Sequence, residues 1–234
     1  MPMSFNPTEF GLKKEHLYEI IATSHSITKD GTKIQPNASC MGIRLVENNM
    51  IQIKPFYTTS TYQNLKDNSI ITLNFVDDVY LYALAALKHP NSQIELFEFP
   101  QEYYEFQHLD SLYMDIPYIK SSWGILTCRV SKEFKETKRD DLGKTMVPIF
   151  RLEVISSNLF RRSYKLFNRA ESLALEIIIL ATRLKIAKSN ENEQQVSKIY
   201  DKIRIHSNDV KRFGKNERAL MTLELVNRYI SKLI

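Results

Sequence analysis

This chain of 234 residues is poor in cysteine and has no long apolar run. Its two cysteines, Cys40 and Cys128, are too few for a disulfide framework or a thiolate metal cluster. The most apolar segment, 173–181, contains Glu176 and falls far short of the roughly 18 apolar residues that a membrane span needs. The N-terminal residues lack a basic stretch followed by an apolar one, so we expect no secretory signal. We therefore expect a cytoplasmic protein without a membrane partner.

Several familiar catalytic motifs are also missing. The sequence has no P-loop, no G-x-G-x-x-G, no G-x-S-x-G and no H-E-x-x-H. Its five histidines lack the spacing of metal ligands, so we expect no metal site. The composition is ordinary for a globular protein, with 43% hydrophobic and 25% charged residues. The net charge of +5 favours anionic partners only slightly.

Residues 16–157 are predicted to form mainly β-strands. Short β-branched runs alternate there with polar turn clusters, which is the pattern of successive hairpins. Around Ile51 and Ile53, apolar and polar residues alternate, so one face of that strand is buried and the other is wet. The predicted strands are 16–24, 40–46, 50–56, 69–76, 123–137 and 145–157, with turns at 29–32 and 47–49 and a turn at 138–144 that contains Gly143.

Two short helices and a long loop are predicted among these strands. Residues 61–67 form one or two helical turns after a Thr/Ser loop. Asp77 is predicted to cap a helix over 78–88, because a carboxylate there accepts hydrogen bonds from the free N–H groups of the first turn. Residues 89–120 hold three prolines and a cluster of Tyr, Phe and Glu, which favours a long covering loop with short pieces of regular structure.

The last third of the chain changes to a helical pattern. Asn168 is predicted to cap a helix, with Glu171 reaching back in a capping box. Apolar stripes at helical spacing predict two further helices, and Gly214 lies between the second and third, where a left-handed residue is needed. The sequence thus predicts a β domain at 1–157 and a small bundle of three helices at 158–234.

Gly42 and Arg44 carry the first indication of a binding site. Gly42 lies within a predicted strand, where glycine marks either close approach of a ligand or a bulge at a barrel corner. Arg44 projects from the same side of that strand and can clamp a phosphate dianion with two hydrogen bonds. Four hydroxyl groups stand directly before a predicted helix start, where the helix dipole favours anions, although a simple cap and turn would use the same residues. They belong to Thr58, Thr59, Ser60 and Thr61.

An ordered series of short motifs runs through most of the chain. They are Asp30-Gly31, Pro36-Asn37-Ala38, Met41-Gly42-Ile43-Arg44, Ile53-Lys54-Pro55-Phe56, Ser60-Thr61-Tyr62-Gln63-Asn64-Leu65, Leu73-Asn74-Phe75-Val76-Asp77-Asp78 and Phe167-Asn168-Arg169-Ala170-Glu171. In this order they resemble an uncharacterised, mostly archaeal FMN-binding family with a flavin-reductase-like split barrel. The resemblance implies an α+β fold, in which an antiparallel split β-barrel that binds FMN is followed by a small C-terminal helical bundle.

The same resemblance implies a homodimer with FMN near the subunit interface. The implied phosphate ligands come from one strand and the helix entrance: Arg44, Ser60 and Thr61, with Thr58 and Thr59 as lesser candidates. The implied ring contacts are backbone groups of four consecutive residues: Ser39, Cys40, Met41 and Gly42. Cys40 either lies near the flavin or serves as a small buried thiol. Two polar residues either contact the ribityl chain or ring, or serve the helix surface and strand hydrogen bonding: Asn64 and Asn74.

Two classes of function stay open at this point. The first is an FMN-dependent oxidoreductase that passes hydride or electrons to an unknown substrate, with a reduced nicotinamide or deazaflavin as donor. The second is a non-catalytic module that binds flavin or nucleic acid. The C-terminal helices carry many lysines and arginines, but acidic residues are interspersed and no aromatic stacking motif accompanies them. We therefore interpret these basic helices as a solvated face or a dimerisation element, and we do not expect a nucleic-acid partner.

Overall fold

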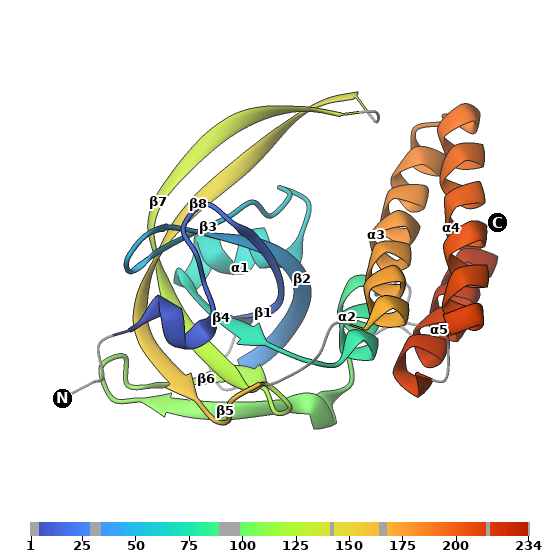
Figure 1. Ribbon diagram of the computed structural model, residues 1–234. Coiled ribbons are helices and arrows are strands. Elements are labelled where there is room, and N and C mark those ends of the chain that lie inside the picture. Colours follow the sequence, from blue (N-terminus) through green and yellow to red (C-terminus); the bar gives the residue numbers. More distant parts are fainter. Residues whose placement is uncertain are drawn as a thin grey trace. The chain divides into compact units, whose positions relative to one another are not determined.

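The computed structural model describes residues 5–28, 34–88, 99–140, 143–163, 168–213 and 216–233. By its internal contacts the chain divides into two compact units, which Figure 1 shows in sequence colours. Residues 78–99 belong to the helical unit, although barrel strands precede and follow them in the sequence. The barrel unit comprises 1–77, 100–138 and 145–163, and the helical unit comprises 78–99, 139–144 and 164–234.

Six strands close the barrel in the order β1-β2-β3-β8-β7-β4. Neighbouring strands are antiparallel in the pairs β1–β2, β2–β3, β3–β8, β1–β4 and β4–β7. This closed barrel confirms the predicted fold class. The predicted turn at 29–32 lies outside the described residues. The strands are β1 (Leu17–Ile27), β2 (Ile34–Glu47), β3 (Met50–Ile53), β4 (Ile70–Phe75), β7 (Gly124–Asp140) and β8 (Gly143–Leu159).

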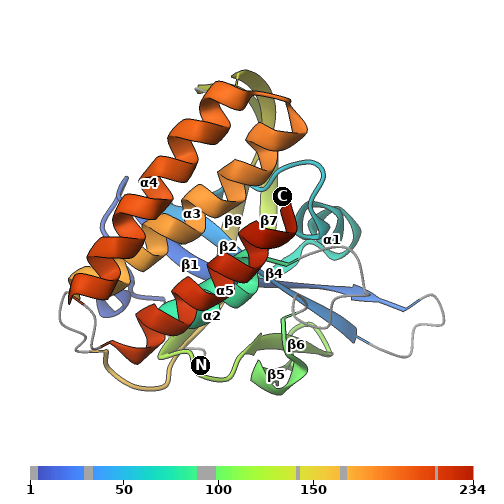
Figure 2. The same cartoon turned by 90° about the vertical axis from the view of Figure 1, so that its right-hand side faces the viewer.

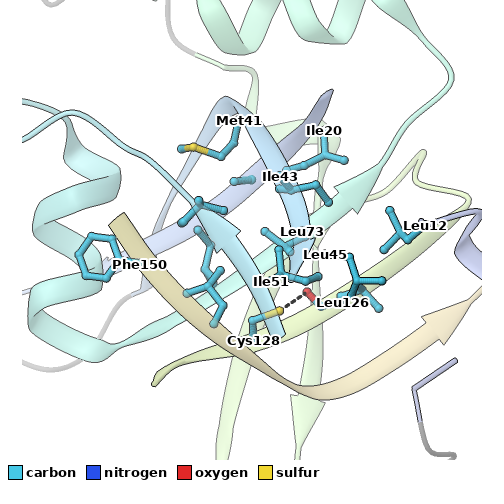
Figure 3. Packing of buried hydrophobic residues seen from close by; sticks show 14 of the residues in the cluster. Leu12, Ile20, Met41, Ile43, Leu45, Ile51, Leu73, Leu126, Cys128 and Phe150 are labelled. Carbon is cyan, nitrogen blue, oxygen red and sulfur yellow. Dashed lines mark hydrogen bonds between the residues drawn. The ribbon is translucent and has the colours of Figure 1, made fainter. Parts of the chain in front are cut away.

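The barrel interior is filled by alternate residues of each strand, as Figure 3 shows. Ile43 of β2 and Ile51 and Ile53 of β3 are completely buried in this core. Successive side chains of a strand point to opposite faces. Residues next to these isoleucines, such as Arg44 and Gln52, therefore lie on the outer wall of the barrel. That outer wall carries the candidate site.

The later part of 89–120, predicted as a long loop with short pieces of regular structure, is more ordered than predicted. Residues 89–98 lie outside the described residues, but the segment that follows forms a second, two-stranded sheet. Pro117 is tolerated within it because each strand of a two-stranded sheet has a free edge, where a missing N–H costs nothing. The elements are a 3₁₀ turn (Gln101–Tyr103), β5 (Tyr104–Leu109) and β6 (Met114–Ile119).

The helix at 78–88 forms, but a neighbouring residue caps it. Asp78 has an extended backbone, and its carboxylate accepts a hydrogen bond from the N–H of Tyr80 at 2.9 Å. The prediction that Asp77 is the cap is therefore wrong by one position. Asp77 instead accepts a hydrogen bond from Arg161 Nη2 at 3.1 Å. The helices of the chain are α1 (Ser60–Asn68), α2 (Val79–Ala86), α3 (Arg169–Ser189), α4 (Glu193–Phe213) and α5 (Glu217–Leu233), with a 3₁₀ turn at Pro7–Phe10.

Three long helices, α3, α4 and α5, form most of the helical unit, as predicted (Figure 2). Asn168 caps α3 by accepting a hydrogen bond from the N–H of Glu171 at 3.3 Å. The Glu171 carboxylate accepts a hydrogen bond from Asn216 Nδ2 at 3.0 Å, which joins the starts of α3 and α5. Gly214 lies outside the described residues. Within the described ranges, no helix combines the length and the apolarity needed to cross a membrane.

His25 of β1 makes the stability of the barrel unit depend on pH. Its side chain is completely buried, and among the described residues neither ring nitrogen has a hydrogen-bond partner. Burial lowers the pKa of this imidazole below its usual value of 6.5. Below that pH the unfolded chain takes up a proton that the folded chain does not. The stability contributed by neutral His25 is therefore complete above about pH 6.5 and falls as the pH falls.

We expect chemical denaturation to give a lower free energy of unfolding at about pH 5.5 than at about pH 7.5. The loss of unfolding free energy from this one group reaches at most about 1.4 kcal/mol per pH unit. The replacement His25→Phe removes the titrating ring and keeps an aromatic side chain, so this part of the pH dependence should vanish. Parallel pH profiles for the two proteins would show that His25 is not the responsible group.

Candidate functional site

A cavity of about 530 Å³ opens on the barrel unit. This volume lies within the range of small-molecule sites, about 300–1,000 Å³. The cavity is lined by residues of β1, β2 and β3, by residues between β3 and α1, by Thr61 of α1, and by one residue each of β7 and β8. The structure thus brings the predicted strand residues and the predicted helix entrance to one place. The predicted residues that line the cavity are Ser39, Cys40, Met41, Gly42, Arg44, Thr59 and Thr61.

Strand register determines the wall of this cavity. Arg44 stands opposite Leu17 of β1 and Gln52 of β3, and Gly42 stands opposite Glu19 of β1. The pairing of β1 with β2 continues without a shift through Gly42, so no bulge explains this glycine. A Cβ on residue 42 would lie 3.0 Å from Leu17 Cδ1 and 3.6 Å from Glu19 Oε1. Glycine therefore relieves crowding and leaves the backbone open to the cavity between these two side chains.

The entrance of α1 is fixed to β2 by hydroxyl groups. The Thr59 hydroxyl accepts a hydrogen bond from the N–H of Tyr62 at 3.2 Å and donates one to the Phe56 carbonyl at 2.7 Å. Thr61 is buried, and its hydroxyl lies 2.9 Å from the Ser39 hydroxyl. The first N–H groups of a helix have no acceptor within the helix. The positive end of α1 therefore borders the cavity.

Two cations and two carboxylates line the cavity. Arg44 Nη1 donates a hydrogen bond to the Glu15 carbonyl at 2.9 Å, which orients the guanidinium. Lys54 forms an ion pair with Glu136 of β7. Glu19 is half-buried, and burial raises the pKa of its carboxyl above the usual 4.5. When all four groups are ionised their charges balance, whereas a proton on Glu19 leaves a positive cavity that favours anions.

Sequence reasoning missed three of these four charged residues. Lys54 did leave a signal, because it continues the wet face of its strand beyond Gln52. Glu19 also falls on a predicted strand, but which of its faces the cavity occupies depends on the register with β2. Glu136 left no local signal, because its partner Lys54 is 82 positions away in the sequence.

Four predicted residues do not line the cavity. Thr58 and Ser60 are exposed beside the entrance of α1. Asn64 is buried and donates a hydrogen bond to the Ser24 hydroxyl at 3.0 Å. Asn74 is completely buried in β4 and donates across the barrel wall to β1. Asn74 thus makes the strand hydrogen bonds that were one of its two expected roles, whereas Asn64 is buried rather than on the helix surface.

The two cysteines have different surroundings. Cys40 forms no disulfide, and its half-exposed side chain lines the cavity. Cys128 is a free thiol in the barrel core, where burial raises its pKa (Figure 3). In the part of the chain that the structure describes, no three histidine, cysteine, aspartate or glutamate side chains gather as metal ligands.

Comparison with known proteins gives a family and a shared fold. The family model described as "Protein of unknown function (DUF447) N-terminal domain" matches residues 18–161. The uncharacterized protein MJ1453 of Methanocaldococcus jannaschii is 24% identical over 215 residues, which are 92% of this chain and 98% of that protein. The crystal structure of FMN-bound protein MM1853 from Methanosarcina mazei has a TM-score of 0.70 at 16% identity, covering 96% of this chain and 100% of that chain.

Proposed function

Since the chain belongs to the DUF447 N-terminal domain family, we propose that it is a flavoprotein that holds FMN on the outer wall of its barrel and acts as an oxidoreductase. One observation carries this proposal: Arg44 and the positive end of α1 line the same cavity. The FMN-bound state of the similar protein MM1853 supports the choice of cofactor. FMN joins a planar ring to a phosphate dianion, so its site needs cations at one end and an open surface at the other.

The phosphate end is provided by Arg44, Lys54 and the first turn of α1. A guanidinium has five N–H donors, and one hydrogen bond to the Glu15 carbonyl leaves capacity for a bidentate contact with phosphate. Lys54 is held by Glu136, so a bound phosphate would compete with that carboxylate for the ammonium group. The free N–H groups at the start of α1 add neutral donors and a favourable dipole.

The ring end is provided by β2. The paired stretch of β2 and β3 begins only at Ile43, so the neighbouring edge of Met41 and Gly42 opens to the cavity. Backbone N–H and C=O groups on such an edge suit the polar rim of an isoalloxazine. Phe56 and Val147 add apolar surface to the same cavity, which suits a flat aromatic ring.

Bound FMN would supply the chemistry of hydride and electron transfer. The residues of the chain then have to bind the cofactor, orient its ring and exclude water from it. Glu19 adds one chemical group to these tasks. Its raised pKa lets the carboxyl hold a proton to higher pH than a solvated glutamate does, at a position next to Gly42. When it is protonated, this carboxyl places an exchangeable proton inside the cavity. As electron donor we propose a reduced nicotinamide or a reduced deazaflavin.

The test is an FMN titration of the purified full-length protein. We expect one FMN per chain, a yellow protein, and release of the flavin on denaturation. Anaerobic mixing with reduced nicotinamides and a reduced deazaflavin should then bleach the bound flavin with at least one of them. A protein that stays colourless in excess FMN would contradict the cofactor proposal, and bound FMN that no donor reduces would contradict the oxidoreductase proposal.

We further propose that the protein is a homodimer, with a second copy covering the cavity. Leu17 and Phe56 line the cavity and yet expose 57% and 44% of their surface. Large apolar side chains that stay exposed at a binding site are typical of surfaces that a partner covers. Light scattering on the same FMN-loaded sample should give twice the chain mass of 27.4 kDa, and a monomer mass would contradict this proposal.

A further inference from the structure

The helical unit contains a groove of its own, between α3 and α4. The groove encloses about 450 Å³. Leu180 of α3 and Ile199 of α4 line it and are both buried, so they form an apolar floor. Arg183 of α3 and Lys198 and Lys202 of α4 also line it and are exposed. An apolar floor is thus surrounded by three cations from two helices.

These three cations have no ion-pair partner within the described ranges of the chain. Lys198 and Lys202 are four residues apart on one helix, and like charges at this spacing destabilise a helix. The acidic lining residue, Asp201, accepts a hydrogen bond from Arg204 at 3.1 Å. The groove therefore carries three positive charges against a single acidic lining residue, Asp201, and the fold holds the three cations together.

The net charge of the whole chain is smaller than the net positive charge of its C-terminal part. Residues 158–234 hold 16 lysines and arginines against 8 acidic residues, whereas 1–157 hold 16 against 19. The net charge of +5 is thus the difference between a clearly basic C-terminal part and a slightly acidic N-terminal part. A basic surface raises the local concentration of anions and their rate of association.

We propose that the groove between α3 and α4 binds a small organic polyanion, a molecule with two or more phosphate or carboxylate groups on an apolar body. Arg183, Lys198 and Lys202 take the anionic groups, and the floor of Leu180 and Ile199 takes the body. Charge complementarity requires at least two anionic groups on the ligand. This inference does not depend on the proposed FMN site, because the groove lies wholly within the helical unit.

A small molecule fits this groove better than a nucleic acid does. Its volume is that of a small-molecule site. No aromatic side chain lines it to stack on a base. Asp201 and Asp209 interrupt the basic surface of α4, where a phosphate backbone would need a continuous track.

The experiment is calorimetric titration of the full-length protein with three probes: ATP without magnesium, inorganic tripolyphosphate, and a single-stranded oligonucleotide. We expect ATP to bind more tightly than the other two. The double variant K198Q/K202Q should weaken ATP binding tenfold or more, because two charge-assisted contacts are lost. The control K211Q/R228Q removes the same charge from α4 and α5 outside the groove, and should change ATP binding less than twofold.

Each other outcome would overturn the proposal. Equal weakening in both double variants would show binding to the general charge of the unit. Tighter binding of tripolyphosphate or of the oligonucleotide would show that the apolar floor plays no part. Loss of ATP binding in R44A but not in K198Q/K202Q would place ATP in the barrel cavity. Circular dichroism of both double variants should match the parent, so that an unfolded bundle is not mistaken for a lost site.

Discussion

Arg44→Ala is expected to weaken FMN binding by about 1.5–3 kcal/mol, which is roughly a ten- to hundredfold rise in Kd. The physical reason is the difference between the two cations of the cavity. The Arg44 guanidinium is oriented by a backbone carbonyl, whereas the Lys54 ammonium is paired with a carboxylate. A phosphate on Arg44 displaces no competing charge, whereas a phosphate on Lys54 has to displace Glu136. Quenching of flavin fluorescence in a titration measures the change directly.

Two further variants make this result specific. Arg44→Lys keeps the charge and loses the planar fork, so its FMN affinity should fall between those of the parent and the alanine variant. Arg129→Ala removes an exposed arginine of β7 that does not line the cavity, and should leave the affinity unchanged. If Arg44→Ala and Arg129→Ala behave alike, the phosphate lies elsewhere and the proposed site is wrong.

The strands around this site were predictable because local pattern decides them. Alternation around Ile51 and Ile53 marks one buried and one wet face, and the structure buries both residues completely. The same alternation places Arg44 on the outer wall, next to the buried Ile43. The cap at Asn168 was predictable for a similar reason, because its acceptor and donor lie within one helical turn.

Other features depend on contacts between distant segments, which a single sequence does not reveal. Glu19 enters the cavity because β1 pairs with β2 in one register, and a shift by one residue would turn it inward. Glu136 reaches Lys54 from β7, and no rule of local spacing connects them. The β5–β6 hairpin was predicted only as short pieces within a long loop, because the three prolines of 89–120 outweighed its strand-forming residues.

Asn74 shows the same limit for a single residue. A polar side chain in a predicted strand suits a ligand contact and a structural hydrogen bond equally well. The structure places it inside the barrel wall, where Nδ2 donates to the Ile21 carbonyl at 2.8 Å and to the Thr23 hydroxyl at 3.1 Å. Its Oδ1 accepts from the N–H of Ile119 at 2.7 Å. One amide therefore joins β4, β1 and the β5–β6 hairpin.

Asn74→Ala should lower the free energy of unfolding by about 2–4 kcal/mol, because several buried polar groups lose their partner at once. Each buried donor or acceptor left unpaired costs about 1–3 kcal/mol. Asn64→Ala is the matched control: Asn64 is also buried, but its amide donates one hydrogen bond to Ser24, so we expect a loss of about 1 kcal/mol. Urea denaturation of the three proteins measures both differences.

The loss of stability in Asn74→Ala should first affect the β5–β6 hairpin and only then the whole barrel. Because its Oδ1 holds the N–H of Ile119, the β5–β6 hairpin should become sensitive to limited proteolysis in Asn74→Ala before the barrel unfolds. FMN affinity of the folded variant should stay within twofold of the parent, since Asn74 does not line the cavity. A variant of normal stability that no longer binds FMN would instead make Asn74 a cofactor ligand. That result would require the cavity on the outer wall to extend through the barrel, which the complete burial of Asn74 opposes.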